Sequence, residues 1–314
     1  MKRILLILIL AVGLQIQAQD STPLPTSTPS PAPTQVTAPT ERPPAPTTIS
    51  QDGVTLELYF DTLKQGRVGV LHLTGDNISE ARLRFINQES WFFPVEDEGW
   101  YALLAVDMDQ NPRNNYELTV IVGRADAPPL TLTATFGVEL GGFIRESINV
   151  PQDRAYLIDP EIERLEFARM NAVFETYTQE KLWDGFQYPI NSVLTSPFGV
   201  FRTFNGTVET RHTGWDLRAT TGTPVMAMAS GRVAFAGLLD IRGNHIIIDH
   251  GYGVYSGYSH LSQVHVTTGQ TVRAGQIIGV SGNTGRSGGA HLHWELAVNG
   301  LWVDVRDFMA TWLP

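Results

Sequence analysis

The sequence of 314 residues contains no cysteine. Disulfide bonds, thiolate metal ligands, a cysteine nucleophile and a lipid-modified cysteine are therefore excluded, and any metal must be bound through nitrogen and oxygen. The formal net charge is −10, and no cluster of basic residues stands out along the chain. We therefore expect no nucleic-acid partner.

Lysine is missing from the last part of the chain, because Lys181 is the last one. The glycine-punctuated segment 269–279 resembles the hairpins of lipoyl or biotinyl carrier domains, but such a carrier needs an acceptor lysine, so this class is excluded. With 42% hydrophobic residues, the chain is too long and too apolar to be disordered throughout. Its length suits two domains with separate cores and connecting segments.

The N-terminus has two basic residues, a short apolar run from Ile4 to Leu14 and a polar stretch that ends at Ala18. This layout predicts a signal peptide over residues 1–18 and an exported protein that is extracellular, cell-wall associated or periplasmic. The apolar run is short for a membrane span. An uncleaved anchor is the alternative, because Ile16 fits the small-residue rule for cleavage only in part, and only then do we expect contact with a membrane.

Residues 19–50 contain nine of the 19 prolines, interleaved with threonine, serine and alanine. Such a segment cannot form a core and favours extended, polyproline-like conformations. We predict a disordered Pro/Thr-rich linker that holds the folded part away from a membrane or cell wall. A proline motif that binds a partner is the alternative.

Residues 51–140 contain six segments in which apolar and polar residues mostly alternate with a period of two, as in half-buried strands. Turn residues such as those at 75–77 separate them. Short strands at this spacing predict an immunoglobulin-like β-sandwich without the usual disulfide, and no catalytic group of residues is found here. The segments are 54–60, 67–75, 81–86, 100–106, 116–123 and 130–138.

Residues 141–185 form the predicted connector to a C-terminal domain at 186–314. Asp159 followed by Pro160, with acidic residues directly afterwards, is typical of a helix start. We expect this connector helix at about 160–179.

Seven of the eight histidines lie between His212 and His293. His291 and His293 belong to the alternating run HLHWELAV, and a strand would place both on one face. In HTGWD, the central glycine argues against a helix and favours a turn that brings His212 and Asp216 together. Two histidines and one carboxylate make a three-ligand zinc site with an open position for water, whose pKa zinc lowers to about 7.

Five ordered motifs then extend over the 85 residues from 212 to 296: HTGWD (212–216), GTPV (222–225), GNHIIIDHG (243–251), YSHLS (258–262) and a long segment from 269 to 296 that ends in HLHWEL. Together they resemble the M23 family of zinc metallopeptidases, the lysostaphin-type or LytM-type peptidoglycan endopeptidases. Secreted relatives of this type also carry an N-terminal immunoglobulin-like domain, which agrees with the sandwich predicted above.

The resemblance implies one Zn²⁺ per chain, with His212, Asp216 and His293 as ligands and His260 and His291 as catalytic histidines. All five positions are filled. The three remaining histidines of this region match no catalytic position and are assigned to structure; they are His245, His250 and His265.

The sequence departs from many relatives just before His260, where it has Gly257, Tyr258 and Ser259. A glycine inside a strand indicates a bulge or a close approach of another backbone, and it would alter the groove beside His260. Arg202, Asn205 and Tyr258 are candidates for contacts in the cleft.

The sequence thus predicts a mainly β protein: an immunoglobulin-like sandwich, a helical connector and a C-terminal antiparallel β-sheet metallopeptidase domain. The implied function is hydrolysis of peptide bonds in peptidoglycan stem peptides or cross-bridges, with peptidoglycan as the partner. The alternative is a catalytically silent module of LytM type that binds the cell wall or activates an amidase.

Overall fold

The computed structural model describes residues 39–314. The predicted signal peptide (1–18) and residues 19–38 of the predicted linker lie outside the described residues. Within residues 39–314, no helix combines the length and the apolar character that crossing a membrane requires.

The first strand lies partly inside the segment predicted as linker. β1 (Thr47–Gln51) pairs antiparallel with β2 (Val54–Leu58) across a tight turn in which Asp52 and Gly53 both have positive φ angles, of 48° and 79°. The predicted linker end at residue 50 is therefore wrong. Threonine and isoleucine at the start of β1 favour extended backbone, and pairing with β2 brings this segment into the sheet.

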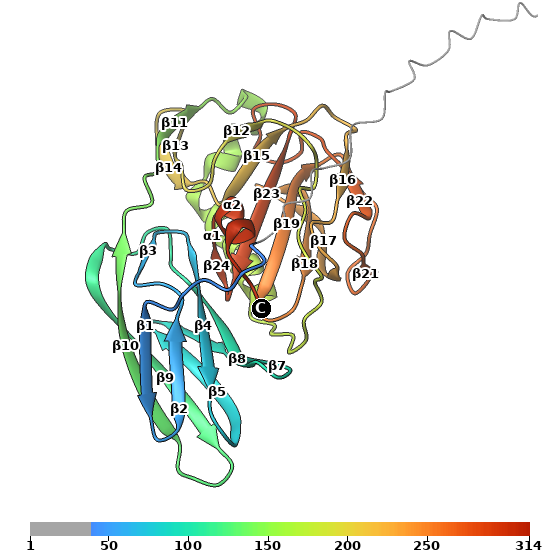
Figure 1. Ribbon diagram of the computed structural model, residues 1–314. Helices are drawn as coiled ribbons and strands as arrows, with labels where there is room; N and C mark the ends of the chain where they lie inside the picture. Colours follow the sequence, from blue (N-terminus) through green and yellow to red (C-terminus); the bar gives the residue numbers. More distant parts are fainter. Residues whose placement is uncertain (1–38) are drawn as a thin grey trace, which may run out of the picture. The chain divides into compact units, whose positions relative to one another are not determined.

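Ten strands form two five-stranded sheets, ordered β1-β2-β4-β8-β7 and β3-β10-β9-β5-β6 (Figure 1, blue to green). Their facing sides share one core, which includes Leu56, Leu71, Leu83, Leu118 and Leu132. Each of the six predicted segments overlaps one of these strands, and the immunoglobulin-like type of the sandwich stays a prediction. The other strands are β3 (Thr62–Lys64), β4 (Val68–Thr74), β5 (Ile78–Phe85), β6 (Gln88–Trp91), β7 (Phe93–Val95), β8 (Gly99–Ala105), β9 (Arg113–Arg124) and β10 (Leu130–Glu139).

The connector contains β11 (Arg145–Ile148), the 3₁₀ helix η1 (Gln152–Ile158) and helix α1 (Pro160–Phe174). Asp159 caps α1 by accepting a hydrogen bond from the backbone N–H of Glu161, as the sequence suggests. The helix ends at Phe174, not near residue 179 as predicted. The backbone that follows is bonded to β19 and to the turn before it: the carbonyl of Thr176 accepts from the hydroxyl of Tyr255, and that of Thr178 accepts from the backbone N–H of Tyr252.

The C-terminal part is built on an eight-stranded sheet in which all neighbouring strands are antiparallel, in the order β12-β15-β23-β19-β18-β17-β21, with β24 beside β23. Figure 1 shows these strands in yellow to red. The predicted mainly β fold is confirmed. The strands of this sheet are β12 (Leu194–Ser196), β15 (Gly214–Arg218), β17 (Gly231–Leu239), β18 (Gly243–Asp249), β19 (Val254–Leu261), β21 (Thr271–Val272), β23 (His291–Val298) and β24 (Leu301–Trp302).

Two three-stranded sheets, β11-β13-β14 and β16-β22-β20, and a short helix α2 (Val305–Ala310) complete this part. Within the sheets, β11 runs parallel to β13, so the connector and the C-terminal part share one sheet. The remaining strands are β13 (Phe201–Phe204), β14 (Val208–Arg211), β16 (Pro224–Met226), β20 (Gln263–Val264) and β22 (Ile277–Val280).

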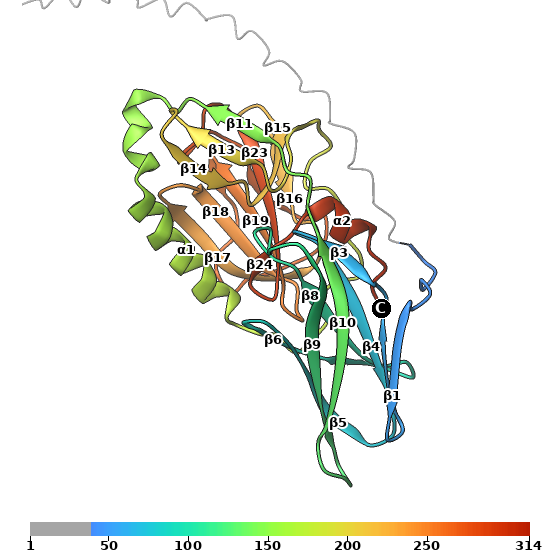
Figure 2. The same cartoon turned by 90° about the vertical axis from the view of Figure 1, so that its left-hand side faces the viewer.

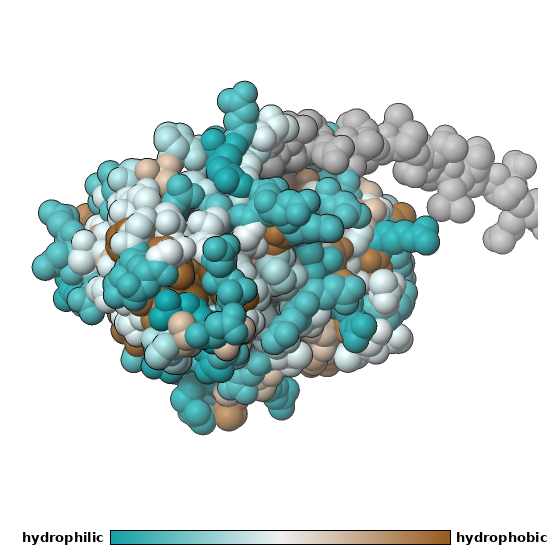
Figure 3. Space-filling view, turned by 60° about the horizontal axis from the view of Figure 1, so that its bottom comes forward, coloured by the Kyte–Doolittle hydropathy of each residue, from teal (hydrophilic) through white to brown (hydrophobic). Residues whose placement is uncertain are grey.

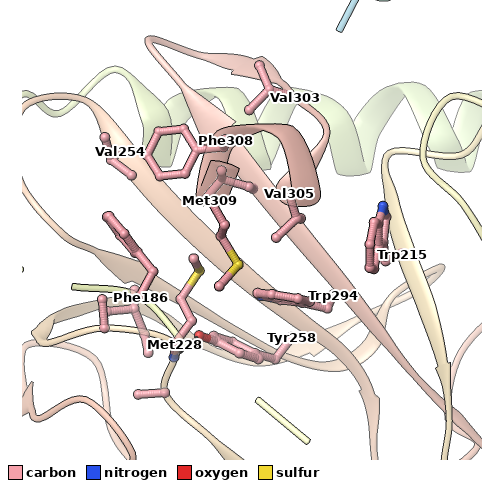
Figure 4. Close-up of a cluster of buried hydrophobic side chains, with 14 of the residues drawn as sticks. Phe186, Trp215, Met228, Val254, Tyr258, Trp294, Val303, Val305, Phe308 and Met309 are labelled. Carbon is pink, nitrogen blue, oxygen red and sulfur yellow. Dashed lines mark hydrogen bonds between the residues drawn. The ribbon is translucent and has the colours of Figure 1, made fainter. Parts of the chain in front are cut away.

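The two faces of the large sheet have different partners. On one face, Trp215, Tyr258 and Trp294 are packed with Phe308 of α2 in a buried core (Figure 4). On the other face, Met170 of α1 packs in a smaller cluster with side chains of β17, β18, β19 and β23, and Figure 2 shows α1 beside these strands. On the surface seen in Figure 3, hydrophobic residues occupy only small areas between hydrophilic ones.

We predict that Gly214→Ala destabilises the fold. A Cβ atom at Gly214 would lie 2.3 Å from the backbone carbonyl oxygen of Trp294, which cannot rotate away as a side chain can. The variant would push β15 from β23 and lower the free energy of unfolding by about 1–3 kcal/mol or more, as overpacking does. Urea denaturation followed by circular dichroism measures this. Gly289→Ala is the control, because no atom lies within 4 Å of its added Cβ, and equal stability of the two variants would contradict the prediction.

Candidate metal centre

The pairing of β15 with β23 brings a carboxylate and an imidazole together, because Asp216 lies directly opposite His293. His212 precedes β15, and its Nε2 lies 3.0 Å from Asp216 Oδ1 and 2.9 Å from His293 Nδ1. His293 Nδ1 lies 2.8 Å from the same Asp216 oxygen. The expected turn between His212 and Asp216 is not formed: β15 begins at Gly214 and is extended through Asp216, and the strand pairing makes the contact.

His260 reaches the same group through an irregularity in β19. Tyr258 and Leu261 both face the core, although strict alternation would place them on opposite faces. Opposite them, the pairing advances two residues on β18, from Asn244 to Ile246, and three on β19, so β19 has a bulge of one residue. His260 within this bulge has a φ angle of 61°, and its ring lies with its centroid 5.9 Å from that of His293.

His291 lies on the same face of β23 as His293. Its ring centroid is 4.7 Å from that of His260, and its Nε2 lies 3.5 Å from Asp216 Oδ1. The structure therefore brings together all five predicted site residues: His212, Asp216, His260, His291 and His293.

Each of these imidazole rings has one nitrogen that faces the centre (inner) and one that points away from it (outer). The hydrogen bond of the outer nitrogen determines whether the inner nitrogen of the neutral ring carries a lone pair. His260 Nδ1 donates to the carbonyl of Thr284, and His291 Nδ1 donates to the carbonyl of Gly289, each at 2.8 Å. His212 Nδ1 likewise donates to the carbonyl of Pro197. A carbonyl oxygen only accepts, so in each neutral ring Nε2 is the unprotonated nitrogen and faces the centre.

His293 has the opposite arrangement. Its Nε2 lies 3.2 Å from Glu295 Oε1, so this nitrogen is the donor and Nδ1 faces His212 and Asp216. His212 Nε2, His293 Nδ1 and Asp216 Oδ1 are then three acceptors at mutual distances of 3.0 Å or less. Their lone pairs repel unless a cation lies between them, and two imidazoles with one carboxylate are a donor set that suits zinc. The residues present therefore fit a metal ion.

Burial and charge set the protonation of these groups. Burial lowers the pKa of His212 to about 4, and burial together with His291 and His293 lowers the pKa of His260 well below its usual range. Burial raises the pKa of Asp216, but His212 and Arg202 outweigh it and hold this pKa well below its usual range. The Arg202 guanidinium donates to Asp216 Oδ2, the oxygen that does not face the histidines. Burial lowers the pKa of His293, but Glu295 and Asp216 outweigh it and raise this pKa. The centre thus combines an ionised Asp216 with His212 and His260 rings that stay neutral.

Sequence reasoning missed the charged groups behind His293. Glu295 accepts from Arg242 Nε and Nη2, at 2.9 and 2.6 Å, and from the hydroxyl of Thr213. Burial raises the pKa of Glu295, but Arg242 and His293 hold it well below its usual range. Glu295 follows His293 by two residues on one strand, a spacing that the alternation of HLHWELAV indicates. Arg242 lies in the turn between β17 and β18, and no motif or periodic pattern in the sequence identifies it.

Two of the cleft candidates are corrected. Tyr258 is fully buried in the core on the opposite face of the sheet, where its hydroxyl accepts from the backbone N–H of Met228. Asn205 accepts a hydrogen bond from the backbone N–H of Val150 and so binds the connector. Gly257 lies close to side chains and not to another backbone as predicted: an added Cβ would lie 3.0 Å from Glu295 Oε2 and 3.1 Å from the His245 ring.

The histidines assigned to structure lie outside the group. His245 Nδ1 and Ser259 Oγ are hydrogen-bonded at 3.0 Å, and His250 bonds the carbonyl of Ser230 and the hydroxyl of Ser256. A cavity of about 50 Å³ lies beside the centre; its lining includes His212, His260 and His293 and, from α1, Glu163 and Phe167.

Comparison with known proteins matches residues 210–305 to the model of peptidase family M23. DD-carboxypeptidase/endopeptidase Mpg of Neisseria meningitidis serogroup B is 42% identical over 112 residues, which cover 34% of this chain and 25% of that protein. Peptidoglycan DD-endopeptidase ShyA of Vibrio cholerae serotype O1 is 45% identical over 89 residues, which cover 28% of this chain and 21% of that protein. The chain thus spans about a quarter of the length of these curated relatives.

Among solved structures, a Pseudomonas aeruginosa protein assigned to peptidase M23 is 25% identical, with a TM-score of 0.59. The similarity covers 79% of this chain and 95% of that one. The shared fold therefore extends well beyond residues 210–305.

We predict that Arg242→Met destabilises the protein more at neutral pH than in acid. Removing one partner of a buried ion pair costs about 3–5 kcal/mol, and here Glu295 would lose its cation. In the wild type, Glu295 contributes stability above its unfolded pKa of about 4.3, which is lost as the pH falls through its lower folded pKa. In the variant, protonation of Glu295 relieves the unpaired charge, so the deficit shrinks as the pH falls from 7 towards 4.

Urea denaturation at several pH values measures this deficit. The control is Arg164→Met on the exposed side of α1, where the lost ion pair with Glu161 has little effect on stability. An Arg242→Met deficit that stays constant between pH 7 and 4 would show that an unpaired Glu295 is not its cause.

Proposed function

The chain contains a peptidase family M23 domain at residues 210–305. We propose that its C-terminal part is an exported, zinc-dependent endopeptidase that hydrolyses peptide bonds in peptidoglycan stem peptides or cross-bridges. One observation carries the proposal: three acceptor atoms of His212, Asp216 and His293 converge next to the unprotonated Nε2 atoms of His260 and His291. The substrate class is supported by the name of a relative, a peptidoglycan DD-endopeptidase.

His212 Nε2, Asp216 Oδ1 and His293 Nδ1 would hold one zinc ion. When bound, zinc supplies Lewis acidity, which polarises a carbonyl group and makes water acidic enough to be deprotonated near neutral pH. The acceptors Pro197 and Glu295 place the proton of the neutral His212 and His293 rings on the nitrogen that points away from the centre, and the low pKa of Asp216 keeps its carboxylate ionised. Second hydrogen bonds of this kind also fix the ring orientations of metal ligands.

His260 and His291 are the groups that would move protons. The Nε2 atom of each ring is unprotonated because its Nδ1–H donates to a backbone carbonyl. Either atom can accept a proton from the attacking water and later pass it to the leaving amine. A ring that has taken up the proton is a cation, which stabilises the negative charge that develops on the oxygen of the scissile carbonyl.

The second candidate is a silent module that binds the cell wall or activates an amidase. Such a module needs no intact catalytic group. Here all five side chains are present and their inner nitrogens are oriented together, which favours the enzyme.

We expect the protein to cleave purified peptidoglycan in a metal-dependent way. A chelator should abolish release of fragments, and zinc added in excess should restore it. Mass spectrometry of the fragments identifies the new termini and so the bond. Intact peptidoglycan in the presence of protein that has bound stoichiometric zinc would favour the silent module.

Substitutions should separate metal binding from proton transfer. We expect His293→Ala to lose both zinc and turnover, because it removes a ligand atom. His260→Ala and His291→Ala should keep zinc and lower kcat about 10²–10⁴-fold, the usual effect of removing a general acid or base. Metal content by atomic absorption, measured beside peptidoglycan turnover, checks both. Zinc loss from His260→Ala or His291→Ala, or zinc-dependent turnover by His293→Ala, would refute these roles.

A further inference from the structure

A continuous series of ion pairs connects helix α1 to the metal centre. Glu166 of α1 accepts from Arg242 Nη1 at 2.9 Å. The other edge of the same guanidinium donates two hydrogen bonds to Glu295, and Glu295 Oε1 lies 3.2 Å from His293 Nε2. The side chain of Arg242 thus holds two carboxylates at once, one on α1 and one beside a metal-ligand candidate.

This series is excluded from water. Glu166 and Glu295 are each 2% exposed and Arg242 is 4% exposed. The rings of Phe167 and Trp302 lie beside the guanidinium, with centroids 5.4 and 5.5 Å from its central carbon. Two carboxylates and one guanidinium carry a net charge of −1, which a cation at the adjacent centre would offset.

Glu166 also fixes the turn between β17 and β18. Its carboxylate accepts from the backbone N–H groups of Ile241 and Arg242, at 2.6 and 3.2 Å. The carbonyl of Arg242 in turn accepts from the backbone N–H of His260 at 2.8 Å. This turn therefore holds the bulge that directs His260 to the centre.

We propose that Glu166 is a positioning residue of the metal centre, which acts through Arg242 and Glu295 on the ring of His293 and through the backbone of Arg242 on His260. This inference rests on the proposed function, since it assumes that His293 binds a metal. Glu166 precedes residues 210–305, the part that matches the family model, so helix α1 supplies to this centre a group from outside that match.

Zinc affinity of the full chain tests the proposal without substrate. Glu166→Gln keeps the shape of the side chain, but the amide NH2 group that replaces one carboxylate oxygen cannot accept the hydrogen bonds which that oxygen accepts. We expect zinc affinity, from competition with a chromogenic chelator, to fall about tenfold, the lower end of the range for groups behind metal ligands. Visible absorption of the cobalt(II)-loaded protein should also change, because it reports the geometry of the ligands.

Two control variants distinguish a positioning role of Glu166 from a general loss of stability and from a change in the charge of helix α1. Glu161→Gln makes the same change of charge on the exposed side of α1, where the partner is Arg164. Met170→Ala weakens the packing of α1 against the sheet without contact to the ion pairs. Thermal denaturation ranks the stability of all variants, and both controls should keep wild-type zinc affinity.

Wild-type zinc affinity and cobalt spectrum in folded Glu166→Gln would overturn the proposal, as would an equal loss of affinity in Met170→Ala. Should Glu166→Gln fail to fold, Arg242→Lys takes its place: it keeps the charge but cannot hold both carboxylates, so unchanged affinity there overturns the proposal too. A wild-type chain that binds no zinc would instead contradict the proposed function.

Discussion

Three atoms that only accept hydrogen bonds lie within 3.0 Å of one another at the centre of this protein: His212 Nε2, Asp216 Oδ1 and His293 Nδ1. Such an arrangement repels itself unless a cation is present and the surrounding groups restrain it. Much of the C-terminal part supplies this restraint. Strand pairing sets Asp216 opposite His293, and Gly214 permits that pairing because the backbone of Trp294 leaves no space for a Cβ atom.

The restraint is exerted from outside each ligand atom. Pro197 takes the outer proton of His212, Glu295 takes that of His293, and Arg202 holds the outer oxygen of Asp216. Each partner leaves the inner atom unprotonated and fixes its direction. The same arrangement recurs at His260 and His291, where backbone carbonyls take the outer protons. One principle, an acceptor behind each ring, thus prepares both metal binding and proton transfer.

Local sequence patterns predicted the parts of this site that depend on strand periodicity. The alternation of HLHWELAV places His291 and His293 on one face, and it marks Glu295 as well. Alternation fails at His260, because a bulge in β19 shifts the count by one, and a single sequence does not show where an extra residue leaves the ladder. The same bulge accounts for Tyr258: strict alternation would place it on the face of His260, but the extra residue leaves Tyr258 in the core on the other face.

The contacts of Glu166 and Arg242 were out of reach for a different reason. They join residues 76 positions apart, on a helix and in a turn, and neither residue belongs to a periodic pattern. Their burial nevertheless has a physical requirement. A buried carboxylate is stable as an anion only beside a cation, and Glu295 needs Arg242 for that. The guanidinium of Arg242 binds Glu295 through Nε and Nη2, so its third nitrogen, Nη1, is a buried donor that needs an acceptor of its own. Glu166 provides it, so a boundary at residue 186, as the sequence predicts, would separate the metal centre from the acceptor of this buried donor behind His293.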